Sequence, residues 1–309
     1  MRIIRDFNEI GEIRNAVVTT GSFDGVHIGH KVILQRLKKL AIETGGETVV
    51  ITFHPHPRKV LYPESAGKNL FLINSQREKI ALLQKAGLDN LIIVEFTQEF
   101  SQITSYDFVK NILLNKLKAR KIVIGFNHHF GHNREGDYGS LRKLGSEWGF
   151  DVEEIPEQDI QNESVSSTKI RKAIQEGNIQ KANAYLDHQY IIMGEARKSS
   201  PELEKIGFPS YTVTIEEDSK LVPPNGVYAV TLVGTDSFSR AMCFIRINES
   251  RPIDTLVEVH LLEHYGSIEG DIVTLLFHKR MREELNFSSS EELKRQLTLD
   301  RNEIDELIF

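Results

Sequence analysis

The first part of the chain alternates short apolar runs with segments whose apolar residues recur at helical spacing. The apolar runs predict buried β-strands at residues 16–20, 48–53, 90–94 and 121–124. The helical spacing predicts α-helices at residues 31–40, 76–86, 106–117 and 170–175. Because these strands are apolar on both faces and helices separate them, the pattern predicts an α/β fold with a parallel sheet covered on both sides.

The pattern changes after a helical connector at residues 178–188. Short β-type runs then dominate, at residues 190–193, 211–215, 226–232, 241–245, 256–261 and 272–277. A helix is predicted at residues 290–297. Short strands followed by one helix are typical of a small closed antiparallel β-barrel with a C-terminal helix. We therefore expect two domains, at residues 1–185 and 186–309.

Composition narrows the class of protein. The 309 residues are 40% hydrophobic and 27% charged, as in soluble globular proteins. A net charge of −6 without a basic block argues against a nucleic-acid partner. The single cysteine, Cys243, excludes an intrachain disulfide and a cysteine-based zinc site. With no signal-peptide core and no apolar run near the roughly 20 residues that span a bilayer, we expect a cytoplasmic protein without a membrane partner.

The segment Gly21-Ser22-Phe23-Asp24-Gly25-Val26-His27-Ile28-Gly29-His30 joins the first predicted strand to the first predicted helix. A helix N-terminus binds phosphate through its free N–H groups and its dipole. Imidazoles at His27 and His30 could also bind an anion that gains charge in a transition state. The segment therefore indicates phosphoryl or nucleotidyl transfer. The alternatives are two solvated histidines or half of a metal site, although no carboxylate or cysteine set lies nearby at zinc-ligand spacing.

Three further polar segments extend this prediction. Residues 53–57, Phe-His-Pro-His-Pro, follow the second strand, and residues 125–136 follow the fourth. Ligands bind beyond the carboxyl ends of parallel strands, so we expect both segments to join His27 and His30 in one site. Residues 165–171, Val-Ser-Ser-Thr-Lys-Ile-Arg, supply hydroxyls and a guanidinium suited to phosphate, although the hydroxyls could be ordinary helix caps.

Residues 21–30 resemble the nucleotide-binding motif of the prokaryotic FAD synthetases, which are riboflavin kinase/FMN adenylyltransferase proteins. More broadly, they are similar to the His-x-Gly-His motif of the nucleotidyltransferase superfamily. Residues 53–57, 125–136 and 166–171 resemble the family's Phe-x-Pro-His-Pro, Gly-x-Asn/Asp-x-x-Phe-Gly-x-x-Arg-x-Gly and Ser-Ser-Thr-x-Ile-Arg motifs. The resemblance covers nearly the whole chain. It implies a Rossmann-like α/β nucleotidyltransferase domain followed by a riboflavin kinase-like β-barrel.

The resemblance also implies a reaction and a set of site residues. The reaction is transfer of AMP from ATP to FMN, which gives FAD and pyrophosphate, with Mg²⁺ bridging phosphates. The residues implied to be catalytic are His27, His30, Asn127 and Arg171. Those implied to bind the nucleotide or its phosphates are Gly21, Phe23, Asp24, Gly25, Gly29, His56, Gly125, Ser166, Ser167 and Thr168. The expected partners are ATP, FMN and FAD, and a homo-oligomer is left open.

The barrel matches its family only in part. Glu258 takes the place of the kinase's catalytic base, and Ser210 and Thr212 are remnants of the same module. The family's ATP-binding loop, laid along this chain, has its glycines at Ser199 and Leu203 and its arginine at Glu204; its Thr-Ala-Asn falls on residues 210–212. Leucine for glycine removes backbone freedom, and glutamate for arginine reverses a charge beside an anion.

We therefore expect an FAD synthetase whose riboflavin kinase activity is lost or weak. The alternatives are a bifunctional riboflavin kinase/FMN adenylyltransferase, a non-catalytic flavin or nucleotide sensor, or adenylyl transfer to another phosphate-bearing acceptor. The intact histidine and arginine motifs argue against a sensor, since a sensor need not keep groups that act in a transition state.

Overall fold

The computed structural model describes residues 1–126, 128–156, 165–199, 201–234, 238–248, 254–263 and 267–308. The chain divides into two compact units, and each is described by itself. The first comprises Met1–Leu70 with Lys79–Ser166, and the second comprises Phe71–Glu78 with Ser167–Phe309. The domain boundary between residues 185 and 186 stays a prediction. Among the described residues, no helix combines the length and the apolarity needed to cross a bilayer.

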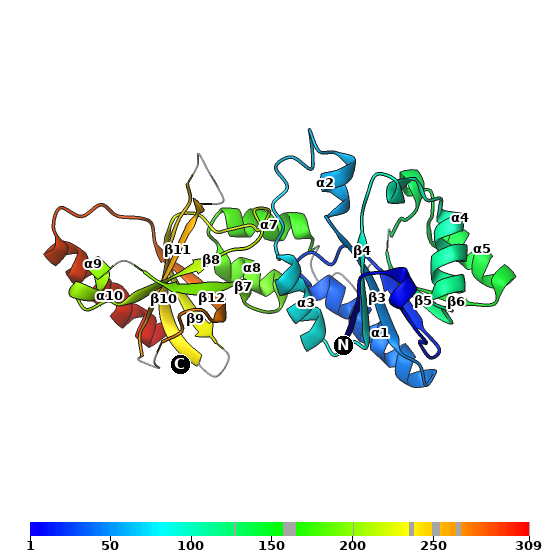
Figure 1. The fold of residues 1–309 in the computed structure, drawn as a ribbon, viewed down its shortest axis with the longest axis horizontal. Coiled ribbons are helices and arrows are strands. Elements are labelled where there is room, and N and C mark those ends of the chain that lie inside the picture. Colours follow the sequence, from blue (N-terminus) through cyan, green and yellow to red (C-terminus); the bar gives the residue numbers. More distant parts are fainter. Residues whose placement is uncertain are drawn as a thin grey trace. The chain divides into compact units, whose positions relative to one another are not determined.

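A six-stranded parallel sheet forms the centre of the first unit (Figure 1). Its strands are β1 (Arg2–Ile4), β2 (Val17–Thr20), β3 (Thr48–His54), β4 (Asn90–Glu95), β5 (Lys121–Gly125) and β6 (Asp151–Ile155). They lie in the order β1-β4-β3-β2-β5-β6, and each neighbouring pair is parallel. The parallel sheet predicted from the sequence is confirmed. The strand order reverses between β2 and β5, and such a switch point is where ligands bind in open α/β sheets.

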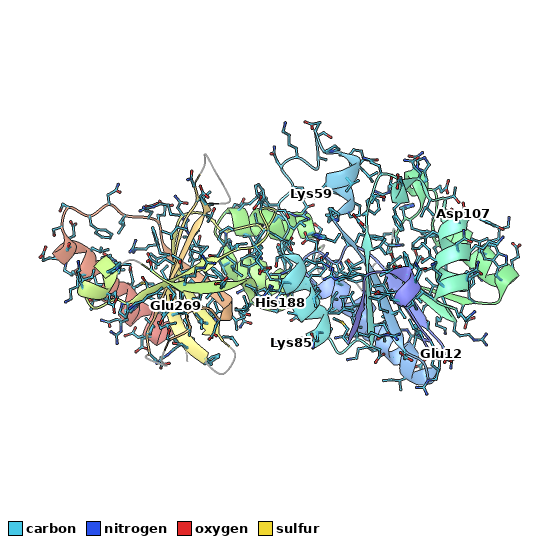
Figure 2. All side chains as sticks on the ribbon, in the orientation of Figure 1. Glu12, Lys59, Lys85, Asp107, His188 and Glu269 are labelled. Atoms are coloured by element: carbon cyan, nitrogen blue, oxygen red, sulfur yellow. The ribbon has the colours of Figure 1, made fainter. Side chains whose placement is uncertain are left out.

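Successive residues of each central strand point to opposite faces of the sheet, so both faces are apolar. Val17 and Val50 pack with leucines of helices α1 (Ile28–Glu43) and α3 (Gln76–Lys85) on one face. Val18 and Val49 face the other side, which is covered by α4 (Ser105–Asp107), the wider π-type turns of η3 (Phe108–Lys116) and α5 (Tyr138–Trp148). Charged side chains such as Glu12 and Asp107 lie at the surface (Figure 2).

Two strands, one longer helix and the short helices of this unit were not predicted from the sequence. β1 is a three-residue edge strand, and β6 is an edge strand that carries three acidic residues, so neither gives an apolar run. α5 contains Gly139 and Gly145, which weaken its helical signal; Asp137 starts it by accepting a hydrogen bond from the backbone N–H of Ser140. The short helices are η1 (Phe7–Glu9), α2 (Pro57–Leu61), η2 (Phe100–Gln102) and η4 (His132–Arg134).

A closed antiparallel barrel forms the second unit, as predicted, with the strand order β10-β11-β8-β7-β12-β9. Its strands are β7 (Tyr190–Lys198), β8 (Ser210–Thr214), β9 (Gly226–Val233), β10 (Phe238–Arg246), β11 (Leu256–Leu261) and β12 (Ile272–Arg282). Its helices are α7 (Ser167–Gln175), α8 (Ile179–Leu186), α9 (Pro201–Lys205) and α10 (Ser290–Leu307).

α10 extends ten residues beyond the predicted end at Leu297. Ile304 packs against Val227 of β9 and Met242 of β10, which gives the added turns an apolar anchor. Asp300, only 3% exposed, accepts hydrogen bonds from Nε and Nη2 of Arg282 at 3.0 and 2.6 Å. The sequence pattern did not reveal this extension because one of the two buried positions of α10 is an aspartate.

Candidate active site

The turn between β2 and α1 has an uncommon backbone conformation. Phe23 and Val26 have positive φ angles of 48° and 42°, and Gly25 has a φ of 93°. A β-branched residue rarely adopts a positive φ, and such strain gathers at functional sites. Val26 and Phe23 are each only 2% exposed, so their packing in the apolar cluster beneath α1 holds the turn in place. The turn delivers His27 to the N-cap of α1.

His27 and His30 form one stacked pair at the start of α1. Their ring centroids are 3.7 Å apart with an interplanar angle of 20°, and the ring of Phe23 lies 5.0 Å from His30. Nδ1 of His30 is buried and has no hydrogen-bond partner within the part of the chain that the structure describes. A buried polar atom of this kind usually has a partner, so its position in a cleft points to a ligand.

Burial holds the pKa of His30 well below 6.5, and the positive charges of His27 and Lys79 lower it further. His30 is therefore neutral at pH 7, and a neutral imidazole still donates one hydrogen bond. Lys79 lies on α3 and is only 4% exposed. Sequence reasoning missed Lys79, because a single lysine in an amphipathic helix carries no motif.

A cleft of about 770 Å³ opens beside the histidine pair. This volume lies in the range typical of small-molecule sites, roughly 300–1,000 Å³. The predicted site residues that line it are Gly21, Phe23, His27, Gly29, His30, His56 and Gly125. The structure thus brings the ends of β2, β3 and β5 to one cleft. Asp24 of the same turn is buried, at 1% exposure.

An aromatic wall forms another part of the cleft. Phe53 lies 5.5 Å from Phe96 and 6.1 Å from Phe100, and the centroids of Phe96 and Phe100 are 5.6 Å apart. These edge and tilted geometries are those that aromatic rings prefer. Phe96 and Phe100 follow β4, whose end carries no polar motif, so sequence reasoning did not place them in the site. The wall offers an apolar surface to a flat ring.

The loop after β5 lines part of the cleft, and Gly131 allows its backbone to pass close to Ser105. Gly131 has a φ of 75°, and a Cβ there would lie 2.5 Å from the backbone nitrogen of Ser105. Only glycine fits this conformation and this close approach. Arg134, at a φ of 61°, also lines the cleft, and its guanidinium was not on the predicted list. Asn127, predicted to be catalytic, lies outside the described residues.

His56 has a local structural role in addition to its place in the cleft. Its Nδ1 accepts a hydrogen bond of 3.2 Å from the backbone N–H of Arg58 and so caps the N-terminus of α2. This cap fixes the ring at the end of β3. A role for His56 in nucleotide binding stays a prediction.

His128 gives this loop a dependence on pH. Burial, with the charges of His129 and Arg134, lowers the pKa of His128 from 6.5 to about 4. The unfolded imidazole binds a proton below pH 6.5, whereas the folded one does not, so stability is full above that pH and falls toward pH 4. At pH 5 we expect a loss of about 2 kcal/mol from this residue. Thermal unfolding of wild type and His128→Asn at pH 8 and pH 5 measures it, and equal losses in both would contradict the assignment.

The hydroxyl and arginine motif, residues 166–171, is divided between the two units. Ser166 ends the first unit, and Ser167, Thr168 and Arg171 stand in the first turns of α7 in the second. Nε of Arg171 donates a hydrogen bond of 2.9 Å to the carbonyl oxygen of Phe71, also in the second unit. That these groups meet the phosphates of a nucleotide in the cleft stays a prediction.

In the barrel, the structure brings Glu258 and Ser210 together. The Ser210 hydroxyl donates a hydrogen bond of 2.8 Å to Oε1 of Glu258, and the Ser199 hydroxyl donates to the same oxygen. The charge of Glu258 adds to burial in raising the pKa of the Cys243 thiol. Thr212 pairs with Glu258 across β8 and β11, but its hydroxyl donates to the carbonyl oxygen of Arg197, at 3.3 Å.

The substituted loop residues have contacts of their own. Leu203 packs, with Ile206, against the apolar cluster that includes Ile304 of α10. The carboxylate of Glu204 pairs with Nζ of Lys198 at 3.2 Å. Ser199 contacts Glu258, as described above. Leu203 and Glu204, which differ from the family's ATP-binding pattern, therefore help to hold α9 against the barrel.

The fold and the cleft define a two-module protein, with a nucleotidyltransferase-type α/β domain and a closed barrel. A family model described as FAD synthetase matches residues 10–169, and one described as riboflavin kinase matches residues 186–308. The chain belongs to the family of bifunctional riboflavin kinase/FMN adenylyltransferases.

Relatives of that name match almost end to end. The protein from Buchnera aphidicola subsp. Acyrthosiphon pisum is 31% identical over 97% of this chain and 96% of its own. The protein from Escherichia coli strain K12 is 30% identical with the same coverage. A crystal structure described as a macrolide-efflux protein from Streptococcus pneumoniae matches 97% of both chains, with a TM-score of 0.84 and 26% identity. The family predicted from the sequence motifs is confirmed.

Proposed function

We propose that this chain transfers AMP from ATP to FMN and so makes FAD and pyrophosphate. The stacked pair of His27 and His30, at the N-terminus of α1 and inside the cleft, carries the proposal. An oxygen of the FMN phosphate attacks the α-phosphorus of ATP. The bond from that phosphorus to the oxygen bridging to the β-phosphorus breaks, and pyrophosphate leaves with the electron pair.

Each part of the cleft has a role in this proposal. The imidazoles of His27 and His30 donate hydrogen bonds to the α-phosphoryl oxygens, whose charge grows in the transition state. The N-terminal N–H groups of α1 add a positive dipole end. The wall of Phe53, Phe96 and Phe100 accepts the apolar flavin ring. Asn127, Ser167, Thr168 and Arg171 hold phosphate groups by virtue of the family motif.

Mg²⁺ belongs to the proposal as a companion of ATP. Within the described ranges, no group of three or more histidine, cysteine, aspartate or glutamate residues is placed to hold a metal ion. Mg²⁺ keeps several waters and often binds through one or two carboxylates plus substrate phosphates. We therefore propose that the phosphates of ATP would supply most of the ligands of the ion. When bound, the ion would neutralise phosphate charge.

The direct test uses the purified full chain with Mg-ATP and FMN, with the products separated by chromatography. We expect FAD and pyrophosphate in equal amounts. Absence of FAD, with the protein folded and ATP bound, would overturn the proposal. A parallel reaction with riboflavin, which lacks the terminal phosphate, tests the acceptor separately. Riboflavin can accept AMP only after the barrel has phosphorylated it.

Riboflavin phosphorylation by the barrel is a second candidate function. The relatives are named as bifunctional, which favours the bifunctional alternative over the expected loss of kinase activity. The contact of Glu258 with Ser210 supports it, since a carboxylate oriented by hydroxyls suits a general base. The residues Ser199, Leu203 and Glu204 lead us to expect a rate below that of adenylyl transfer.

Arg171→Ala is expected to raise the KM for ATP about 10–100-fold, with a smaller fall in turnover. A hydrogen bond to a charged group is worth about 1.5–3 kcal/mol, and each 1.4 kcal/mol is a factor of ten. Steady-state kinetics with FMN fixed and ATP varied measure the change. The matched control is Lys172→Ala, which removes a cation that is 77% exposed on the same helix. An unchanged KM in Arg171→Ala would rule out a phosphate contact.

A further inference from the structure

The second unit contains an ion pair that is fully buried. Nζ of Lys220 lies 2.7 Å from Oε2 of Glu78, and both side chains have 0% exposure. Burying charges is costly, and such a pair persists only when its remaining donors and acceptors are also satisfied. Neither residue belongs to a motif that the proposed reaction uses.

Lys220 uses all three of its ammonium protons. Besides Glu78, Nζ donates to the carbonyl oxygen of Ile73 at 2.5 Å and to that of Ile191 at 2.8 Å. The ammonium group also lies 4.3 Å from the centre of the Tyr190 ring, a distance typical of a cation–π contact. Because all three N–H donors are hydrogen-bonded, the ammonium group of Lys220 is held in one position.

Both carboxylate oxygens of Glu78 also accept hydrogen bonds from backbone N–H groups. Oε1 accepts a hydrogen bond of 2.9 Å from the backbone N–H of Met193 in β7, and Oε2 accepts one of 2.9 Å from that of Ser75. We call residues Phe71–Glu78 the strap. Two further backbone bonds hold the strap to the barrel unit, from Leu72 N–H to Ser219 at 2.7 Å and from Leu221 N–H to Leu72 at 2.8 Å.

The strap begins at the residue that holds Arg171. The carbonyl oxygen of Phe71 accepts the hydrogen bond from Nε of Arg171, at 2.9 Å. Because a guanidinium is planar and rigid, a bond that fixes Nε also fixes the directions of the two terminal nitrogens. A shift of the strap would therefore turn the fork that binds phosphate bidentately.

We propose that Lys220 and Glu78 are positioning residues, which act through the strap to orient Arg171 toward the phosphates of ATP. The inference rests on the proposed function, which assigns those phosphates to Arg171. A buried ion pair often adds little net stability compared with apolar residues of the same size, so a role in fixing conformation gives it a purpose. The pair contacts no substrate.

A double-mutant cycle on the full chain tests this proposal. Lys220→Met, Arg171→Ala and the combination are compared by kcat and KM for ATP in FAD formation. We expect Lys220→Met to raise the KM for ATP about tenfold with little change in kcat, and to add nothing when Arg171 is already alanine, because coupled residues are not additive. Additive effects, or a fall in kcat alone, would overturn the proposal.

Two more variants separate positioning from general loss of structure. The double variant Glu78→Gln/Lys220→Met removes both charges of the buried pair, so no unpaired charge is left in the interior. It replaces Lys220→Met in the test if that single variant does not fold. We expect it to raise the KM for ATP as Lys220→Met does, and a wild-type KM would contradict the inference. Arg77→Met breaks an exposed pair of 2.6 Å between the strap and Glu216, and its KM should change less than twofold if the buried pair is responsible.

The wild-type enzyme separates this inference from the proposed function. If wild type makes no FAD from FMN, both fail together. If wild type makes FAD and Arg171→Ala raises the KM while Lys220→Met does not, the proposed function stands and the positioning role is wrong.

Discussion

His30→Ala is expected to lower the turnover number for FAD formation about 10²–10³-fold, the usual effect of removing one preorganised donor to a developing charge. The dissociation constant for ATP should change only a few-fold. The physical reason is that Nδ1 of His30 is buried with no hydrogen-bond partner among the described residues and the ring is stacked on His27, so its position is set before the substrate arrives. An interaction made only in the transition state lowers kcat and kcat/KM together.

Single-turnover measurements, with ATP binding measured separately, distinguish this role from ground-state binding. Gln35→Ala serves as the control, because Gln35 is exposed on the same helix and contributes nothing to the cleft. It should behave as wild type. A His30→Ala enzyme with normal turnover, or one that has lost ATP binding in proportion, would refute the assignment.

Glu258→Gln is expected to slow phosphorylation of riboflavin about 10²–10⁴-fold, the range over which a general base contributes. Glutamine keeps the size of glutamate and an oxygen that can accept from Ser199 and Ser210, so the barrel should fold normally. FAD formation from FMN should remain at the wild-type rate, because Glu258 belongs to the other unit.

Chromatography of products from riboflavin and, in parallel, from FMN measures both activities of one preparation. Glu269→Gln, at an exposed turn of the same unit, is the matched control. Equal rates from riboflavin in wild type and Glu258→Gln would show that another group is the base. If wild type forms no product from riboflavin, the second candidate function is wrong and the loss expected from the altered loop is correct.

The central strands could be predicted because burial on both faces leaves a simple trace in the sequence. Val49 and Val50 face opposite helix layers, and no charged residue interrupts residues 48–53 of their strand. The edge strand β6 has one side open to solvent, and its glutamates are tolerated there. Apolar runs therefore indicate the middle of such a sheet but not its margins, and both missed strands lie at the edges.

Candidate site residues could be predicted only where several chemically suited residues lie close together in the sequence. His27 and His30 follow a glycine-containing turn between a predicted strand and a predicted helix, and that context together with their spacing indicates phosphate chemistry. Phe96 reaches the same cleft from the end of β4, and Lys79 acts on His30 from α3. Neither stands in a motif, since an aromatic residue or a lysine on a helix usually has an ordinary packing or surface role. The contact of Lys220 with Glu78 could not be predicted either, because the two residues are 142 positions apart in the sequence.

The strap has a consequence for biosynthesis. Glu78 leaves the ribosome 142 residues before its buried partner Lys220, which at about 5–20 residues per second is a delay of roughly 7–30 s. During that interval the parallel sheet can assemble, while the strap has no barrel to join. The strap, whose charged side chains are Arg77 and Glu78, therefore stays in water until the later strands of the barrel close around it. In such a nascent chain, the buried pair of Glu78 and Lys220 can form only after most of the protein has been synthesised.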